Sequence, residues 1–560
     1  MESFSALKRR TTDILHNVHQ NLPSLPNVPS VPSAASQKKD AINGTWERID
    51  VPSVPRSSHS LDIVHGTAYV FGGEIQPRQP VDNDMHIITL PWSSAGADYL
   101  KVKAVAAKPD EQPRKTEIQH PAQTEVEDVE ETFETPAEQN DKNLDDVSLA
   151  SPDPPAGEAE SQSKGKELAG SEKPELGDVP APRVGHATAV IGSRIFLFGG
   201  RGGPDMKPLD EAGRVWIFDT RSNTWTYLDP APVVPGGNIT PQPAPRSYHS
   251  ATSIDRPREF APSRPKEPET WQQWALGDTS KTGIPQAPIV GNVAEDARDE
   301  ESDGYGTFFI HAGCLASGER TNDIWAFNVH DRTWTELPAA PGPARGGTAI
   351  CVSKSRLFRF GGFDGEKEIG GQLDFLHLEV ETFDDKGAKG EVTVRARGGW
   401  QTILESDPNT ESTEIHAEPA QVWPEPRSVT SFEAITSGAG YEYLVLIMGE
   451  RDPSSEGHEG AGKFLNDVWT FQVPPLGMTA ASVTAAMWQA VGRKTGEGKW
   501  TQVDLAPYDD DNSDEMPESR GWQASAPMGE LEESGILIWG GLGEDNQRLG
   551  DGWILRVGNA

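Results

Sequence analysis

The stretch Phe196-Leu197-Phe198-Gly199-Gly200 ends a run of apolar residues in a pair of small residues, and related stretches occur five more times in the sequence. A short apolar run bounded by glycine is typical of a buried β-strand that is followed by a sharp turn. Glycine suits such a turn because it adopts a positive φ without steric cost. The other copies of this doublet motif are Tyr69–Gly73, Phe309–Gly313, Phe358–Gly362, Leu446–Gly449 and Ile538–Gly541. The repetition predicts that one structural unit is built several times along the chain.

Three further features recur around each doublet. An arginine, usually preceded by proline, lies upstream, and in the first three copies a histidine follows it, at His59, His186 and His249. Downstream lies an alternating apolar run such as Asn322–Phe327 or Asn466–Phe471, and then, in most copies, a run that contains tryptophan. Such runs, separated by Gly, Pro, Asn and Asp, predict four antiparallel strands per unit. The arginines are Arg56, Arg183, Arg246, Arg345, Arg427 and Arg520, and the tryptophans are Trp225, Trp334, Trp400 and Trp500, with Tyr99 in the first unit.

Six units of four strands predict an all-β chain folded as a six-bladed β-propeller, in which each small sheet buries its faces against its neighbours. The sixth unit ends at Val557 without a tryptophan strand, whereas a spare strand, Thr45–Asp50, precedes the first unit. We therefore expect the N-terminal strand to complete the last blade, because this arrangement leaves no unpaired strand edge.

The acidic character of the chain is concentrated in a few segments. The 560 residues include 50 Lys and Arg against 86 Asp and Glu, which gives a formal net charge of −36. Residues 106–180 alone hold 20 acidic and 7 basic side chains with one aromatic residue, a composition that cannot bury enough apolar surface to fold. Residues 254–303, 405–420 and 508–518 are also acidic. We expect residues 45–560 to form the propeller, with 106–180 as a disordered insertion between blades 1 and 2 and 254–303 as an insertion within blade 3.

Two more segments lie outside the repeat. Residues 1–44 are interpreted as an N-terminal helix over Ser3–Val18 and a Pro/Ser linker, the helix being either docked on the domain or a membrane-surface or partner-binding segment. Residues 479–493 are rich in alanine and predict a short helical insertion within blade 5, which either packs on the rim or offers a partner groove.

The composition excludes several classes of protein. A nucleic-acid-binding function is not expected, because such binding begins with basic surface. No run of 18 or more apolar residues exists, so no transmembrane segment is predicted, and no apolar signal-peptide core is present. The two cysteines, Cys314 and Cys351, are too few for a disulfide framework. We expect a cytoplasmic, monomeric protein.

The doublets, the upstream arginines and the tryptophan strands together resemble the kelch-repeat family of the galactose oxidase/kelch superfamily, whose period is about 50 residues. The resemblance covers most of residues 45–560. We expect a stand-alone kelch protein, because the first 44 residues leave no room for an added adaptor domain. In kelch propellers that bind peptides, the residues after the arginine and the loops after the doublet line one face of the ring. The resemblance therefore implies a partner-binding face at Ser57, Ser58, Arg201, Ser247, Tyr248, Arg320, Asp364, Ser428, Arg451 and Trp522.

Enzymes of the same superfamily offer alternative interpretations. Copper chemistry like that of galactose oxidase requires a tyrosine linked to cysteine, but Cys314 and Cys351 both have the sequence context of small core residues. Nitrile-specifier proteins are associated with iron on a Glu-x3-Asp-x3-His motif, and here Glu319 and Asp323 match whereas Phe327 replaces the histidine. We therefore expect no catalytic residues, metal or cofactor.

The function predicted from the sequence is a non-catalytic scaffold that binds a protein or peptide partner through the loop face. The alternative is a small-molecule enzyme or specifier protein. A cytoskeletal scaffold is a third hypothesis, disfavoured because an acidic chain is not attracted to acidic filaments.

Overall fold

The fold was analysed in a computed structural model of the full chain. It describes residues 42–91, 96–108, 176–234, 236–255, 306–382, 392–405, 422–437, 440–457, 460–474, 498–508, 515–529, 532 and 534–559. Within these ranges the regular elements are all β-strands. The predicted helices over Ser3–Val18 and residues 479–493 lie outside the described residues, as do most of the insertions 106–180 and 254–303.

The strands form small antiparallel sheets that follow one another along the chain. The first sheet has the order β2 (Ser60–Val64), β3 (Thr67–Phe71), β6 (Met85–Thr89) and β7 (Asp98–Val102). The second has β8 (Ala187–Ile191), β9 (Arg194–Phe198), β12 (Val215–Asp219) and β13 (Thr224–Leu228). The third has β15 (Ser250–Ile254), β16 (Thr307–Leu315), β17 (Arg320–Asn328) and β18 (Thr333–Leu337), with β14 (Arg246–Ser247) also on β16. The fourth has β19 (Ala349–Ser353), β20 (Arg356–Phe360) and β21 (Gln372–Thr382), with β22 (Val392–Ala396) and β23 (Gln401–Leu404) both on β21.

The last two repeats share one nine-stranded sheet. Its first half is β24 (Ser431–Thr436), β25 (Glu442–Asp452), β26 (Lys463–Gln472) and β27 (Trp500–Pro507). Its second half is β1 (Ile42–Arg48), β31 (Arg548–Asn559) and β30 (Gly535–Gly543), with β28 (Arg520–Gly521) and β29 (Ala524–Pro527) on β30. Two short hairpins complete the described strands, β4 (Glu74–Gln76) with β5 (Gln79–Pro80) and β10 (Arg201–Gly202) with β11 (Lys207–Pro208).

The N-terminal strand β1 joins these two halves. It runs antiparallel to β31, from Ile42 opposite Asn559 to Arg48 opposite Trp553, and parallel to β27. Trp46 of β1 is 2% exposed and packs among residues of β26, β27 and β31, in the position that the tryptophan of the fourth strand holds in other repeats. The first residues of the chain that the structure describes therefore lie beside the last.

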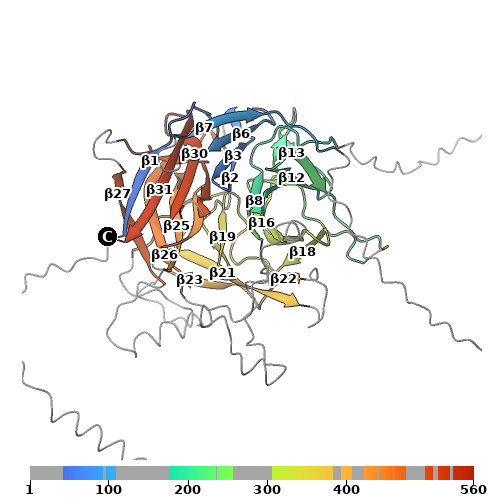
Figure 1. The fold of residues 1–560 in the computed structure, drawn as a ribbon. Helices are drawn as coiled ribbons and strands as arrows, with labels where there is room; N and C mark the ends of the chain where they lie inside the picture. The colour runs from blue at the N-terminus through green and yellow to red at the C-terminus, as the bar shows by residue number, and fades with distance from the viewer. Residues whose placement is uncertain are drawn as a thin grey trace, which may run out of the picture.

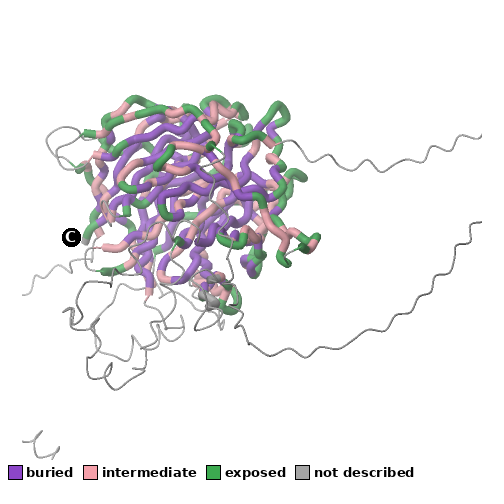
Figure 2. The backbone as a smooth tube through the Cα atoms, turned by 45° about the vertical axis from the view of Figure 1, so that its right-hand side comes forward, coloured by how far each residue is buried: buried purple, intermediate pink, exposed green. Residues whose placement is uncertain are grey.

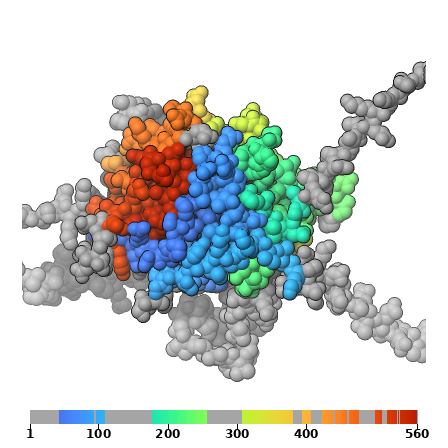
Figure 3. Space-filling view, turned by 90° about the horizontal axis from the view of Figure 1, so that it is seen from above, coloured from blue at the N-terminus to red at the C-terminus, as the bar shows by residue number. Residues whose placement is uncertain are grey.

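The sheets are arranged around a common centre. Figure 1 shows them following one another around the molecule in chain order, from blue through green and yellow to red. The first strands of successive sheets contact each other, β2 with β8, β8 with β15, β15 with β19, β19 with β24 and β24 with β29, and β29 contacts β2. From above, residues of the first repeat lie between the red C-terminal residues and the green second repeat (Figure 3).

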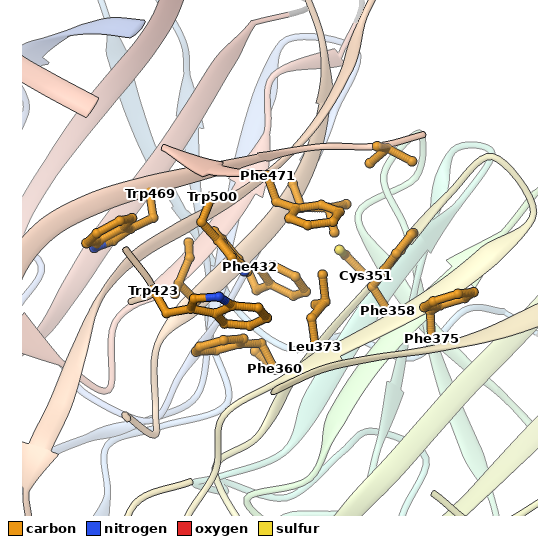
Figure 4. Close-up of a cluster of buried hydrophobic side chains, with 14 residues drawn as sticks. Cys351, Phe358, Phe360, Leu373, Phe375, Trp423, Phe432, Trp469, Phe471 and Trp500 are labelled. Atoms are coloured by element: carbon orange, nitrogen blue, oxygen red, sulfur yellow. The ribbon is translucent and has the colours of Figure 1, made fainter. Parts of the chain in front are cut away.

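The hydrophobic core is divided into six clusters, each between neighbouring sheets. Figure 4 shows the cluster between the fourth repeat and the fifth, where Trp500 of β27 lies against Phe360 of β20 with ring centroids 5.4 Å apart. Trp225 and Trp334 hold the same place on β13 and β18 and are 1% exposed. The buried residues follow the strands and the exposed ones gather at the connections (Figure 2). Each sheet is therefore stabilised by its neighbours.

The described ends of the insertion 106–180 pack on the second repeat. Trp225 N–H donates to Val105 O at 2.8 Å, and Ala107 N–H donates to Trp225 O at 2.9 Å. Residues 105–107 thus lie along β13, at the outer edge of the second sheet.

Candidate functional site

The recurring arginines are buried and hold the turns of the repeat together. All six are at most 2% exposed, and each Nη1 donates to the carbonyl of a doublet residue or its neighbour. Four also form ion pairs with a carboxylate of their own repeat: Arg183 with Glu211, Arg246 with Asp323, Arg427 with Asp467 and Arg520 with Asp551. The ion pair lowers the pKa of Asp323, Asp467 and Asp551 despite their burial. These contacts and this burial give the arginines a structural role in the turns of the repeat.

Two repeats depart from this pattern. Arg56 contacts His86 Nε2 at 2.8 Å where other repeats supply a carboxylate. In the fourth repeat Asp374 accepts from Arg359 Nε at 3.0 Å, and Arg345 Nη2 is buried without a hydrogen-bond partner. The arginine–carboxylate pair is therefore a feature of the repeat that individual copies replace.

The recurring histidines pack beneath the doublet of the preceding repeat. A Cβ built on Gly72 would lie 2.6 Å from His186 Cε1, and one on Gly199 would lie 2.9 Å from His249 Cε1. Burial lowers the pKa of His59 and His186 well below the usual value and lowers that of His249 to about 3. These neutral rings explain why the doublet needs glycine, and they lie in different sheets.

A closed cycle of backbone hydrogen bonds surrounds the centre of the molecule. In each repeat the residue two positions after the arginine adopts a left-handed φ, between 44° and 61°. These belt residues are Ser58, Gly185, Tyr248, Gly347, Val429 and Trp522. Each N–H donates to the carbonyl of the belt residue of the preceding repeat, and Ser58 donates to Trp522, at 2.7 to 3.1 Å. The cycle ties every repeat to the next one at the axis.

A cavity of about 320 Å³ opens above this belt. Five belt residues line it, all except Gly185, together with the residue that directly follows each doublet. These post-doublet residues are Glu74, Arg201, Cys314, Phe363, Glu450 and Leu542. Each pairs as a short antiparallel bridge with the residue after the repeat arginine, as Ser428 does with Glu450. Equivalent positions of all the repeats therefore converge on one cavity.

Two arginines of the lining lie over aromatic rings. The Arg201 guanidinium carbon is 4.8 Å from the centre of the Tyr248 ring, and Arg201 Nε and Nη2 donate to Ser247 Oγ at 3.0 and 2.8 Å. The Arg320 guanidinium carbon is 5.1 Å from the Phe363 ring centre. Among the described residues, the Arg320 guanidinium forms no hydrogen bond or ion pair, and its Nε is buried. These guanidinium groups are held in place by stacking and keep donors for an incoming acceptor.

The carboxylates of the lining differ in their partners. Glu74 Oε1 accepts from Arg548 Nη2 at 3.1 Å, and both side chains are under 10% exposed. Glu450 is 6% exposed, and burial raises its pKa to about 7. Glu368, behind Ser428, accepts from Ser428 Oγ at 3.1 Å, and burial raises its pKa to about 8. The lining thus has a basic wall, Arg201 and Arg320, and an acidic wall, Glu450 with Glu368 behind it, while its Glu74 and Arg548 pair with each other.

Most of the residues that the resemblance implied for the partner-binding face lie together. Ser57, Ser58, Arg201, Tyr248, Arg320, Ser428 and Trp522 line the cavity. Ser247 is fully buried behind Arg201, and Asp364 and Arg451 do not contribute to the lining. Arg451 instead lies at the surface, where its Nη1 is 3.5 Å from Glu425 Oε2 and its Nε is 3.5 Å from Asp452 Oδ2. Sequence reasoning missed Glu74, Cys314, Phe363, Glu450 and Leu542, although one rule, the residue after the doublet, would have found all five.

The residues considered for metal chemistry have other partners. Asp323 accepts from both Nη atoms of Arg246 and from Trp325 Nε1, and Phe327 is fully buried. Cys351 is buried in the fourth repeat, and burial raises its pKa and that of Cys314 in the cavity wall. Within the described ranges, no group of three His, Cys, Asp or Glu side chains converges as metal ligands do, and no helix could span a membrane.

Comparisons with known proteins agree with this repeat. A family model described as Kelch motif matches residues 182–232, which contain the second arginine, doublet and tryptophan strand. Kelch domain-containing protein 3 of Rattus norvegicus is 27% identical over 225 residues, covering 37% of this chain and 56% of that protein.

Two other relatives differ in how much of their length is matched. An N-(sulfonatooxy)prop-2-enimidothioate sulfolyase of Thlaspi arvense is 22% identical over 401 residues, covering 69% of this chain and 95% of the sulfolyase. The flagellar outer arm dynein alpha chain of Chlamydomonas reinhardtii is 25% identical over 283 residues, which is 50% of this chain but 4% of the dynein. A solved structure, "Structure of YjhT", is 11% identical with a TM-score of 0.44, covering 91% of this chain and 99% of that one. The chain spans less than two thirds of the dynein and of the kelch domain-containing protein.

Proposed function

We propose that this chain, a kelch-repeat protein, is a non-catalytic scaffold that binds a protein or peptide partner in its central cavity. The observation that carries the proposal is the convergence of post-doublet and belt residues from different repeats on one lining. The lining combines aromatic rings, hydroxyls and guanidinium groups, which suit a polar or acidic peptide segment.

The architecture in this proposal is a six-bladed propeller whose last blade is completed by β1. The cycle of belt hydrogen bonds and the pairing of β1 with β31 support it. Pairing both ends of the chain in one sheet fixes the lining without leaving an open strand edge. A monomer in the cytoplasm follows from this proposal, and both cysteines are unpaired, as a reducing compartment requires.

The test compares proteins captured by the intact chain with those captured by two variants. Arg320→Met removes a guanidinium group from the cavity wall and keeps an apolar stem, and Arg451→Met removes an exposed one outside it. We expect partners bound by the wild type to be lost with Arg320→Met and kept with Arg451→Met, at unchanged Tm. Identical sets of proteins from both variants would contradict the proposal.

The likeness to the sulfolyase along 95% of its length favours a second candidate, a small-molecule enzyme that uses the same cavity. The chain's own match to an iron motif lacks its third ligand, since Phe327 stands there in the core. Elemental analysis of the purified protein separates the two candidates. Stoichiometric iron in the wild type that is lost in Glu319→Gln would support the enzyme. A wild-type preparation free of iron and copper would eliminate the metal-dependent form of the enzyme.

A further inference from the structure

The acidic wall of the cavity contains a carboxylate without a partner. Glu450 lines the cavity at 6% exposure, yet no described residue donates a hydrogen bond to its carboxylate or pairs with it. Glu74, in the equivalent position of the first repeat, is by contrast paired with Arg548 at 3.1 Å. A buried carboxylate with no donor is unfavourable in the empty protein. Among the described residues, Glu450 is therefore the equivalent position that has no cationic partner, whereas Glu74 has one.

A second carboxyl group reinforces this wall. Glu368 is 8% exposed, and its Oε2 is buried without a hydrogen-bond partner. Its Oε1 accepts from Ser428, whose backbone exchanges both hydrogen bonds with Glu450. Glu450, Asp364 and Asp452 each contribute negative potential at Glu368. The strands of the fourth and fifth repeats thus bring two under-partnered carboxyl groups to the same side of the cavity.

Two guanidinium groups of the same lining carry the complementary charge. Arg201 and Arg320 belong to the second and third repeats, lie on Tyr248 and Phe363, and have no carboxylate partner among the described residues. A ligand with a single charge would satisfy only one of these walls. A ligand that carries both charges would satisfy them together.

We propose that the partner is a peptide segment with one acidic and one basic side chain, and that Glu450, supported by Glu368, binds the ammonium or guanidinium group while Arg201 and Arg320 bind the carboxylate. This inference rests on the proposed function and names the chemistry of its partner. Charge-assisted hydrogen bonds at both ends fix the direction of the segment across the cavity.

Binding of a cation also couples to protons. Burial raises the pKa of Glu450 to about 7 and that of Glu368 to about 8, so near pH 7 Glu450 is partly protonated and Glu368 mostly protonated in the empty protein. A bound cation favours the ionised form, and these protons are released on binding. Affinity therefore increases as the pH rises from about 6 to about 8.5.

The experiment is selection of peptides from a random display library on the intact purified chain. Parallel selections use Glu450→Gln, Arg320→Met and, as a control of the same chemistry away from the cavity, Glu336→Gln, which is exposed on the outer strand β18. We expect the wild type and Glu336→Gln to enrich peptides with an acid and a base. Glu450→Gln should lose the base and keep the acid, and Arg320→Met should lose the acid and keep the base.

The enriched peptide is then synthesised and titrated against the proteins. Glu450→Gln should weaken its binding about tenfold or more, because a charge-assisted hydrogen bond is worth about 1.5 to 3 kcal/mol. The same variant should remove the increase of affinity with pH. Enriched peptides that are acidic without a base, or equal affinity for Glu450→Gln, would overturn the inference and leave the proposed function intact. Failure to enrich any peptide that depends on Arg320 would overturn both.

Discussion

One arginine in each repeat organises its turn through contacts that are almost identical from copy to copy. Its Nη1 donates to a carbonyl at the doublet, and in four repeats the fork also holds a carboxylate. A buried ion pair is stable only when its hydrogen bonds are complete, and here the backbone supplies the remainder. At the scale of the residue, the arginine fixes its turn and thereby positions the neighbouring residues that line the cavity.

The close approach at the doublet can be tested with a matched pair of glycines. Gly199 and Gly203 have φ of 63° and 69°, but a Cβ on Gly199 would lie 2.8 Å from Arg246 O, and one on Gly203 would have no neighbour within 4 Å. Both alanine variants carry the left-handed backbone penalty of about 1–2 kcal/mol. Gly199→Ala should cost about 2 kcal/mol more in the free energy of unfolding, measured in urea, since overpacking adds to the penalty. Equal losses of unfolding free energy in the two variants would contradict this, because they would show that the next repeat accommodates the added methyl group at Gly199 without further cost.

The ion pairs allow a second test at this scale. Asp323→Asn leaves the Arg246 guanidinium, 1% exposed, without an anion. We expect a loss of about 3 kcal/mol in the free energy of unfolding. The control, Asp205→Asn, removes an exposed pair with Lys207 and should cost about 0.5 kcal/mol or less. A loss of stability in Asp323→Asn as small as that of the control would mean that the carbonyl partners of Arg246 stabilise its buried charge without the carboxylate.

At the scale of the element, β1 connects the beginning of the described chain to its end. A spare N-terminal strand followed from counting tryptophan strands, because one repeat lacked its own. Its parallel pairing with β27, which merges the last two repeats into one sheet, could not be predicted, since it depends on how the two sheets meet in space. Trp46 packs where that sheet is continuous.

The contribution of β1 is tested by two substitutions within it. Trp46→Ala empties a site that is 2% exposed and should cost about 3 kcal/mol or more in the free energy of unfolding. Arg48→Ala removes a side chain that is 57% exposed and pairs with an equally exposed Glu515, so its cost should stay within about 1 kcal/mol. Thermal unfolding of both variants distinguishes an integral strand from a loosely attached one, for which the two Tm values would coincide.

The candidate site was only partly accessible from the sequence. Positions after the arginine and some loop residues followed from the repeat, and seven of the ten expected residues line the cavity. Asp364 and Arg451 were selected as members of the loops after the doublets, but both lie outside the lining, to which the residue directly after each doublet contributes. That Glu450 has no partner among the described residues could not be foreseen, since this depends on where the neighbouring repeats place their arginines.

At the scale of the whole molecule, buried titratable groups set the response to pH. Burial raises the pKa of Asp62 to about 7 and that of Glu433 to about 8, so the folded protein holds protons that the unfolded chain releases. Stability from these groups is present at low pH and is lost as the pH rises toward about 8. The buried histidines have the opposite effect on stability. Below about pH 6.5 the unfolded chain binds protons on these rings that the folded protein does not bind, so the stability they contribute is lost as the pH falls.

We therefore expect the Tm to fall between pH 6.5 and about 8, through the pKa values of these two buried carboxyl groups. Glu433→Gln keeps the contact with Ser525 Oγ and should flatten this fall, whereas the exposed Glu456→Gln should not. Differential scanning calorimetry across this range measures the effect. A Tm that rises through the interval would contradict the assigned protonation states.

The central claim, that the cavity above the belt is the binding site, is tested most directly by amide hydrogen exchange of the intact chain with and without a captured partner. Binding there predicts slower exchange at the cavity-lining segments around Phe363, Pro453 and Leu542, with the outer strands β7, β13 and β18 unchanged. Protection confined to those outer strands, with the cavity segments unchanged, would contradict the account.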